Sequence, residues 1–212
     1  SDRLGERGNQ LLSGFTFWKK DENVFYDSTD DYAQISQTAR YFVGGLLDHA
    51  EAMTIFTCPN PNSYKRLAAD PRYTSWGKRN SSALVRVENE IRNDRKGKRV
   101  VFNLSDPSAN PHIALGVVVA AGLDGIKNKT EPGNPIDSNM GDMDTDELKK
   151  AGASQVPSTV LEAISALESD NKFLKGTLSS DILESYLEDK IEEHREQSTR
   201  PTSYEFEKYF NL

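Results

Sequence analysis

Several residue types and patterns are scarce in this 212-residue sequence, and each shortage excludes a class of protein. Cys58 is the single cysteine, so no disulfide can form within the chain, and the cytoplasm or another reducing compartment is expected. The 26 lysines and arginines are outnumbered by 33 aspartates and glutamates, which argues against general nucleic-acid binding, because that function needs a basic face. The longest apolar stretch, HIALGVVVAAGLDGI, is too short and too interrupted by glycine to span a bilayer.

Histidine is also scarce, and the three that occur do not form a motif. His49, His112 and His194 are far apart, and none stands at metal-ligand spacing from a cysteine, aspartate or glutamate. We interpret His49, which lies near the end of a predicted helix, as a structural or surface residue. Cys58 has no obvious base nearby and is interpreted as a buried, inert thiol. The sequence therefore predicts no metal site.

The residues that are present predict a folded domain with strands and helices. Hydrophobic residues make up 36% of the chain and charged residues 28%, which is typical of folded proteins. Alternating apolar residues predict strands, and apolar residues recurring every three or four positions predict helices. The expected strands are 13–20, 82–88 and 99–105, with the last two joined as a hairpin.

The expected helices are 32–57, 112–129, 158–168, 181–197 and 203–210. The region 58–76 holds three prolines and many polar residues, so we interpret it as a long loop. A second polar loop is expected over 130–157, with a short helix at TDELKKAG. Because strands come early and helices mostly later, the fold class is α+β.

Positive charge gathers in the predicted hairpin turn, at Arg95, Lys96, Lys98 and Arg99. Such a run fits a solvated turn, and it also fits a cluster that binds phosphate. In the segment NSYKRL, Arg66 could hold a carboxylate by two contacts or could be a charge at a helix end. From residue types alone, the sequence predicts a soluble α+β domain without an assigned activity.

The order of five segments carries more information. They are QISQTARYFVGGLLDHAEAMTIFTCPNPNSYKRL, SWGKRNSSALVRV, SDPSANPHIALGVVVAAGLDGIKNKTEPGNPID, PSTVLEAISALESDNKFLK and YEFEKYF. Together they resemble the C-terminal half of glutamine synthetase, in its type I, bacterial and archaeal branch. The resemblance runs from about residue 4 to residue 212. It implies one partial catalytic domain over 1–212, without the N-terminal β-grasp domain and the first half of the catalytic domain.

The resemblance implies a specific chemistry. Glutamine synthetases join ammonia to glutamate through a γ-glutamyl phosphate made from ATP. In that family, divalent metals held mainly by glutamates and one histidine align the phosphoryl transfer, and arginines hold the glutamate and the phosphate. The residues at the matching positions of this chain decide whether that chemistry is expected here.

Most of the matching positions hold different residues. The metal-binding histidine corresponds to Leu12, and the histidine near the nucleotide corresponds to Gly14. The metal-binding glutamate corresponds to Val101, whose hydrocarbon side chain cannot coordinate a hard cation. The arginine that contacts substrate corresponds to Asn103, and the one that stabilises the phosphate corresponds to Ser81. Bound magnesium is therefore not expected.

Some of the family's polar residues remain. Arg66 keeps its place in NSYKRL, although the flap that follows in the family is here the shorter AADPRYT, without a glutamate. On the nucleotide side, the resemblance retains Arg86, Lys96, Arg99 and the hydroxyl of Thr16. The three charged residues lack the metals that act with such cations in the family. The resemblance therefore leaves open whether the chain binds ATP without a metal.

We therefore predict a glutamine-synthetase-like protein without catalysis that acts in a structural, assembly or regulatory role through protein–protein contacts. The expected partner is another copy of the chain, an active synthetase subunit or a larger assembly. One alternative is a nucleotide sensor, and another is an ATP-dependent glutamate–ammonia ligase completed by another chain. A link to nitrogen metabolism follows only from the family.

Overall fold

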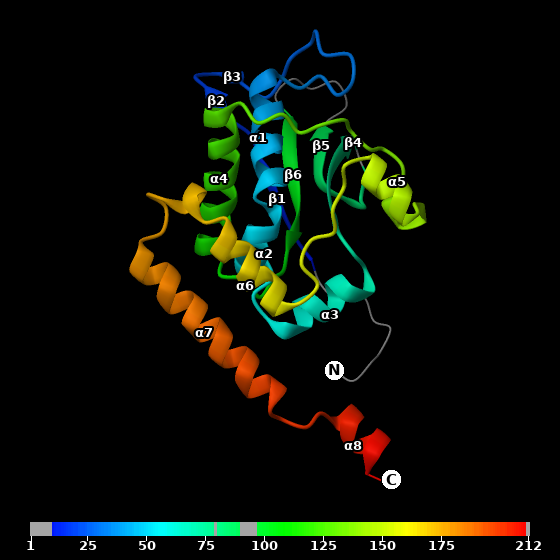
Figure 1. Cartoon of the computed structure of the whole chain (residues 1–212). Coiled ribbons are helices and arrows are strands. Elements are labelled where there is room, and N and C mark those ends of the chain that lie inside the picture. The colour runs from blue at the N-terminus through cyan, green and yellow to red at the C-terminus, as the bar shows by residue number, and fades with distance from the viewer. Residues whose placement is uncertain (1–9, 79, 90–96, 211–212) are drawn as a thin grey trace. The chain divides into compact units, whose positions relative to one another are not determined.

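The computed structural model describes residues 10–78, 80–89 and 97–210 (Figure 1). The chain divides into two compact units, 1–177 and 178–212. The first holds a sheet with helices packed on it, and the second holds two further helices. The α+β class predicted from the sequence is confirmed, while the single domain over 1–212 stays a prediction.

A four-stranded sheet forms the centre of the first unit. Its order is β1, β6, β5, β4, with antiparallel pairing except between β4 and β5, which are parallel. β5 and β6 adjoin as the sequence predicted, with Val85 opposite Phe102 and Val87 opposite Val100. The strands are β1 (Leu11–Phe15), β4 (Tyr73–Lys78), β5 (Ala83–Asn89) and β6 (Lys98–Ser105).

Two long helices, α1 (Gln37–Asp48) and α4 (Pro111–Asn128), lie side by side in the first unit (Figure 1). They approach closely because glycines face each other at the crossing. A Cβ on Gly45 would lie 2.2 Å from the Ala121 carbonyl oxygen, and one on Gly125 would lie 2.3 Å from the Tyr41 carbonyl oxygen. The glycines of GGLLD and AGLDG therefore set the distance between the two helices.

The start of α4 follows the sequence prediction. Asn110 caps it by accepting hydrogen bonds from the backbone of His112 and Ile113, and Pro111 occupies the first turn. The helix ends at Lys129, whose left-handed conformation has φ 56°. The turn DPSANP thus places α4 directly after β6.

The predicted helix over 32–57 is wrong in its extent. Ser36 caps α1, and residues before it belong to turns and a bridge between Tyr26 and Ile35. The helical stretch is then divided at His49, where α1 ends and α2 (Ala50–Thr57) begins. Apolar residues recur at helical spacing on both sides of His49. The apolar pattern therefore did not reveal that the helix is interrupted at His49.

The predicted loop over 58–76 is also wrong. It contains α3 (Pro61–Ala69) and most of β4. Asn60 caps α3, and Pro61 stands in its first turn, where a proline has no backbone hydrogen bond to lose. The prolines that suggested a loop therefore mark a helix start.

The remaining described elements complete the first unit. α2 packs on α6, and the helix predicted at TDELKKAG is present as α5. The elements of the first unit not yet given are β2 (Trp18–Lys19), β3 (Glu22–Asn23), η1 (Met140–Asp142), α5 (Thr145–Lys150), α6 (Val160–Ser169) and η2 (Lys172–Leu174).

The second unit consists of α7 (Ser180–Ser198) and α8 (Ser203–Tyr209), and neither helix contains a buried residue. Thr202 and Glu205 form a capping box at the start of α8. Large apolar side chains are exposed on this unit: Ile182, Ile191, Tyr204, Phe206, Tyr209 and Phe210. No helix of the described residues is long and apolar enough to cross a membrane.

Candidate functional site

The positions that the resemblance assigns to metals and nucleotide meet on the sheet. Gly14 of β1 lies opposite Val101 of β6, and Val101 lies opposite Arg86 of β5. Directly opposed residues of antiparallel strands project from the same face, so these three positions form a row across three strands. Leu12 lies two residues from Gly14 and projects from the same face of β1. The fold therefore brings the matched positions together.

The residues in this row do not offer metal ligands. Val101 is 3% exposed and Leu12 is 47% exposed, and both present only hydrocarbon. Among the described residues, no group of three or more histidine, cysteine, aspartate or glutamate side chains could hold a metal ion. A divalent cation on this face would need ligands from other parts of a complete site.

Asn103, where the resemblance implies an arginine, forms hydrogen bonds within the chain. Its Nδ2 donates to the backbone oxygens of Ser81 at 2.9 Å and Ala83 at 3.1 Å. Its Oδ1 accepts from Nε2 of Gln10 at 2.5 Å. The buried amide thus joins β6 to the segments that start β5 and β1, and it has become part of the framework.

The two arginines that the resemblance assigns to the nucleotide side share one carboxylate. Arg86 and Arg99 each place a guanidinium nitrogen 3.2 Å from an oxygen of Glu88. Glu88 lies opposite Arg99 in the β5–β6 register and two residues from Arg86 on β5, so all three side chains are on one face. An incoming phosphate would have to compete with Glu88 for both cations.

The other predicted nucleotide-side residues are not placed in this cluster. Lys96 lies outside the described residues. The Thr16 hydroxyl accepts a hydrogen bond from the Trp18 indole nitrogen at 2.9 Å.

Lys98 corrects the interpretation of the basic run as a solvated turn. It lies in β6, it is buried, and its Nζ donates to the Ala33 carbonyl oxygen at 2.5 Å. Burial, and then the charge of Lys78, lower the pKa of Lys98 to about 8. The described part of the run therefore consists of one buried amine and one arginine that is paired to Glu88, and Arg95 and Lys96 lie outside the described residues.

Arg66 lies beside Asp106 of the DPSANP turn. One guanidinium nitrogen is 3.7 Å from Oδ2 of Asp106, which also accepts a hydrogen bond from the Ser63 hydroxyl at 3.0 Å. Burial alone would raise the pKa of Asp106, but hydrogen bonds from Ser108 and Ser63 and the charge of Arg66 hold it below its ordinary value. Arg66 therefore has an internal carboxylate in place of a substrate.

Cys58 is buried, as the sequence predicted, and its Sγ donates to the Leu104 carbonyl oxygen at 3.1 Å. Burial raises the pKa of the thiol to about 12, against the opposing charge of Arg66. Cys58 is a neutral thiol at physiological pH and is a poor nucleophile there.

His49 is a structural residue. Its Nδ1 lies 2.6 Å from Oδ2 of Asp170, its Nε2 lies 3.1 Å from Oδ2 of Asp124, and its ring stacks on Phe173 at 4.1 Å. Asp124 belongs to α4, and Asp170 follows α6 directly. His49 thus connects the α1–α2 junction to α4 and to the end of α6. Its partners Asp124, Asp170 and Phe173 do not belong to the row on the sheet.

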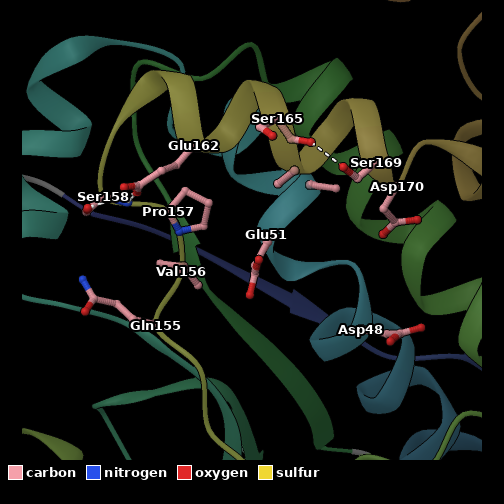
Figure 2. A pocket seen from close by; sticks show the side chains of 12 residues that line it. Asp48, Glu51, Gln155, Val156, Pro157, Ser158, Glu162, Ser165, Ser169 and Asp170 are labelled. Carbon is pink, nitrogen blue, oxygen red and sulfur yellow. Dashed lines mark hydrogen bonds between the residues drawn. The ribbon is translucent and has the colours of Figure 1, made fainter. Parts of the chain in front are cut away.

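A pocket of about 770 Å³ lies between the α1–α2 region and α6 (Figure 2). Figure 2 shows Glu162, Ser165, Ser169 and Asp170 along one wall and Glu51 opposite them. Glu162 is engaged with Ser158, whose hydroxyl and backbone N–H donate to Oε2. None of the positions that the resemblance assigns to metal, nucleotide or substrate lines this pocket.

Glu88 is the residue of this site that sequence reasoning missed. The sequence did contain a signal for this pairing. Arg86 and Glu88 lie two residues apart on one predicted strand and so share a face, and Arg99 starts the next predicted strand. The pairing of Glu88 with Arg99 depends on the strand register, however, and the sequence of the hairpin alone did not fix that register.

Comparisons with known proteins show the family of the chain. A family model described as the glutamine synthetase catalytic domain matches residues 5–209. The chain is similar to glutamine synthetase of Sulfolobus acidocaldarius, with 37% identity over 212 residues, covering 98% of this chain and 45% of that protein. It is also similar to glutamine synthetase of Pyrococcus furiosus, with 39% identity over 223 residues, covering 99% and 49%.

Solved structures give the same result. The chain superposes on GmaS without ligand with a TM-score of 0.80 and 28% identity, covering 97% of this chain and 45% of that one. It superposes on a GmaS complex with ADP with a TM-score of 0.78 and 28% identity, covering 97% and 46%. The chain therefore spans about half the length of the relatives it matches.

Proposed function

Because the chain belongs to the glutamine synthetase catalytic-domain family, we propose that it is a member without catalysis that acts through protein–protein contacts. The family resemblance found in the sequence is confirmed. The loss of activity and the role in an assembly are our proposal, and so is a reducing compartment for a chain with one buried thiol.

The observation that carries the proposal is Val101 in the row between Gly14 and Arg86. The family resemblance implies a metal-binding glutamate at Val101, and a buried isopropyl group cannot hold the metal ion that would neutralise the charge of a transferring phosphoryl group. Leu12 stands where the resemblance implies a metal-binding histidine. Groups of this kind commonly contribute a factor of about a hundred or more each to catalysis, so losing several leaves little activity.

Exposed apolar side chains support a role in contacts. On α8, Tyr204, Phe206, Tyr209 and Phe210 are all exposed, and the rings of Phe206 and Phe210 lie 4.4 Å apart. Clustered exposed aromatics of this kind mark protein–protein contact sites more often than solvated surface. Another copy of the chain, an active synthetase subunit or a larger assembly could cover them.

The proposal is tested by γ-glutamyl transfer and by calorimetric titration of the 212-residue chain with ATP, with and without magnesium. We expect no transfer and no magnesium-dependent binding, because the ligands for the metal are missing. Glutamine synthetase of Pyrococcus furiosus serves as the active control in both assays. Tight binding of ATP that requires magnesium, or measurable transfer, would contradict the proposal.

A nucleotide sensor is the second candidate, and the similarity to a GmaS complex with ADP favours it. Arg86 and Arg99 could hold phosphate oxygens, although each is now paired with Glu88. Binding of ATP that is equal with and without magnesium, and that strengthens in Glu88→Gln, would support this candidate. Equal and undetectable binding by both chains would eliminate it.

A ligase completed by another chain is favoured only by length, since the chain spans about half of its relatives. Val101 opposes it, because a second chain would have to supply the missing carboxylate within an existing sheet. Transfer activity in a purified complex that contains this chain, with none in the chain alone, would revive it.

A further inference from the structure

We propose that His49, Asp124 and Asp170 form a pH-sensitive latch, which holds the end of α6 at the α1–α2 junction only while the His49 ring carries two protons. The three residues come from the α1–α2 junction, α4 and the end of α6, all within the first unit. The latch concerns the packing of helices in this unit, so it does not depend on the function proposed above.

Both ring nitrogens of His49 contact a carboxylate. Nδ1 lies 2.6 Å from Oδ2 of Asp170, and Nε2 lies 3.1 Å from Oδ2 of Asp124. An ionised carboxylate only accepts hydrogen bonds, whereas a neutral imidazole has a proton on one nitrogen and a lone pair on the other. Both contacts are therefore hydrogen bonds only when both nitrogens are protonated. A neutral ring would place a lone pair against one of the two carboxylates.

The surroundings of the His49 ring hold it in place. Its side chain is 9% exposed, and the ring stacks on Phe173 with centroids 4.1 Å apart and planes 17° apart. The backbone is fixed as well, because the His49 N–H donates to the Gly45 carbonyl oxygen at 3.2 Å at the end of α1. When the ring loses a proton, the conflict is therefore relieved by movement of a carboxylate and not of the ring.

Asp170 is the carboxylate that we expect to move. Its side chain is 38% exposed, whereas that of Asp124 is 26% exposed and also accepts a hydrogen bond from Nδ2 of Asn128 at 2.8 Å. Asp170 also stands at the C-terminal end of α6, where the partial negative charge of the helix disfavours a carboxylate. A protonated ring offsets that repulsion and a neutral ring does not. The latch therefore stabilises the end of α6 at low pH, and this contribution is lost as the pH rises.

No other cation takes the place of His49. Within the described residues, no lysine or arginine forms an ion pair with Asp124 or Asp170. His49 ends α1, where the helix favours a cation, and precedes α2, where the helix disfavours one, so these two effects oppose each other. The other charged groups within four residues of the latch are all exposed and screened by solvent. They are Asp48, Glu51, Lys127, Glu168 and Lys172.

The latch also adjoins the pocket between the α1–α2 region and α6. Asp170 lines this pocket, and Figure 2 shows it at the end of the wall that carries Glu162, Ser165 and Ser169. Movement of Asp170 away from His49 would change the charge and the shape of that wall. A change of pH therefore alters the pocket as well as the packing of α6.

Hydrogen exchange of the full chain from pH about 5.5 to about 8.5 tests the latch, because this range extends on both sides of the ordinary histidine value of about 6.5. The readout is the protection of residues 164–176, measured relative to the unfolded chain at each pH. We expect this protection to fall about threefold to tenfold as the pH rises, between the effect of an exposed ion pair and that of a hydrogen bond to a charged group.

Two variants and a control separate the latch from other effects of pH. In His49→Gln the side chain does not titrate, so the pH dependence of protection should disappear. In Asp170→Asn it should shrink, because an amide can donate to the ring or accept from it and so suits both forms. His112→Gln is the matched control, since His112 is an exposed histidine of α4 outside the latch. It should keep the pH dependence of the wild type.

Nitrogen NMR of the His49 ring in the wild type is the second measurement, and it does not require any variant to fold. Both ring nitrogens should be protonated at the low end of the pH range, and the loss of one proton should coincide with the fall in protection. Three outcomes would overturn the inference: protection that does not change with pH, the same pH dependence in wild type and His49→Gln, or a neutral ring while the segment is fully protected.

Discussion

At the residue scale, polar side chains at the positions matched by the family resemblance find their partners within the chain. Asn103 holds backbone carbonyls, and Glu88 occupies both Arg86 and Arg99. The guanidinium group of Arg66 lies 3.7 Å from a carboxylate oxygen of Asp106. Buried polar groups need partners, and these side chains find them within the chain. These polar residues therefore have a structural explanation that needs no ligand.

Lys98 gives a residue-scale prediction with a definite sign. Its folded pKa is lowered to about 8, below the ordinary lysine value of about 10.4 in the unfolded chain. Between these values the unfolded state binds more protons, so the free energy of unfolding rises with pH there. Below pH 8 the buried charge costs stability. Lys98→Met should therefore raise the free energy of unfolding at pH 7 by about 1–3 kcal/mol.

The advantage of Lys98→Met should shrink as the pH rises from 8 to 10.5, because the wild-type amine then becomes neutral in the folded state. Urea unfolding of both chains at a series of pH values measures this difference. A difference that stays constant over that range would show that Lys98 is not the titrating group.

At the scale of elements, close packing of α1 on α4 and the joints between helices decide the architecture. Gly45 and Gly125 let the two helices approach closely, and His49 at the end of α1 contacts Asp124 of α4 and Asp170 after α6. Strand pairing then brings β1, β6 and β5 together. The position of the candidate site follows from this framework and not from any loop of its own.

Gly45→Ala tests the helix crossing. The new methyl group would lie 2.2 Å from the Ala121 carbonyl oxygen, so the helices would have to separate. Overpacking of this kind commonly costs about 1–3 kcal/mol, which thermal or urea unfolding would detect.

Gly116→Ala is the matched control on α4. A Cβ on Gly116 would meet only the Thr177 methyl group at 3.7 Å, so the substitution should be neutral or should stabilise by about 0.4–1 kcal/mol through the helix preference of alanine. Equal effects of the two substitutions would contradict the role given to Gly45.

At the scale of the whole molecule, the chain has two units with different degrees of burial. The first contains the core, including Phe42, Trp76 and Phe102, whereas α7 and α8 contain no buried residue. Helices without fully buried side chains gain little stability from packing, so the second unit is expected to gain stability from contacts. A protein that acts through contacts would have such a region.

Hydrogen exchange of the isolated chain tests this difference. Amides of α7 and α8 should exchange much faster than those of the central turns of α4, because their opening needs little loss of packing. Addition of a partner that covers α8 should slow exchange there. Exchange in α8 of the isolated monomer that is as slow as in α4 would contradict the prediction.

The sequence by itself determined the family and several local features. The ordered segments identified the relatives, the DPSANP turn predicted the start of α4, and hydrocarbon at Leu12 and Val101 argued against a metal. These inferences hold because a residue type fixes what its side chain can coordinate, and a cap acts on residues next to it. Pattern alone failed at 58–76, where prolines of a helix start resembled those of a loop.

Only the tertiary structure decided the pairs that are distant in the chain. His49 meets Asp170 across 121 positions, Gln10 meets Asn103 across 93, and Arg99 meets Glu88 through the strand register. It also decided that the outer edge of β4 is covered, because Thr74 and Trp76 form backbone hydrogen bonds with Ser154 and Ile136. Such contacts depend on how helices and strands pack. The polarity of a side chain shows that it needs a partner when it is buried, but not which partner it will have.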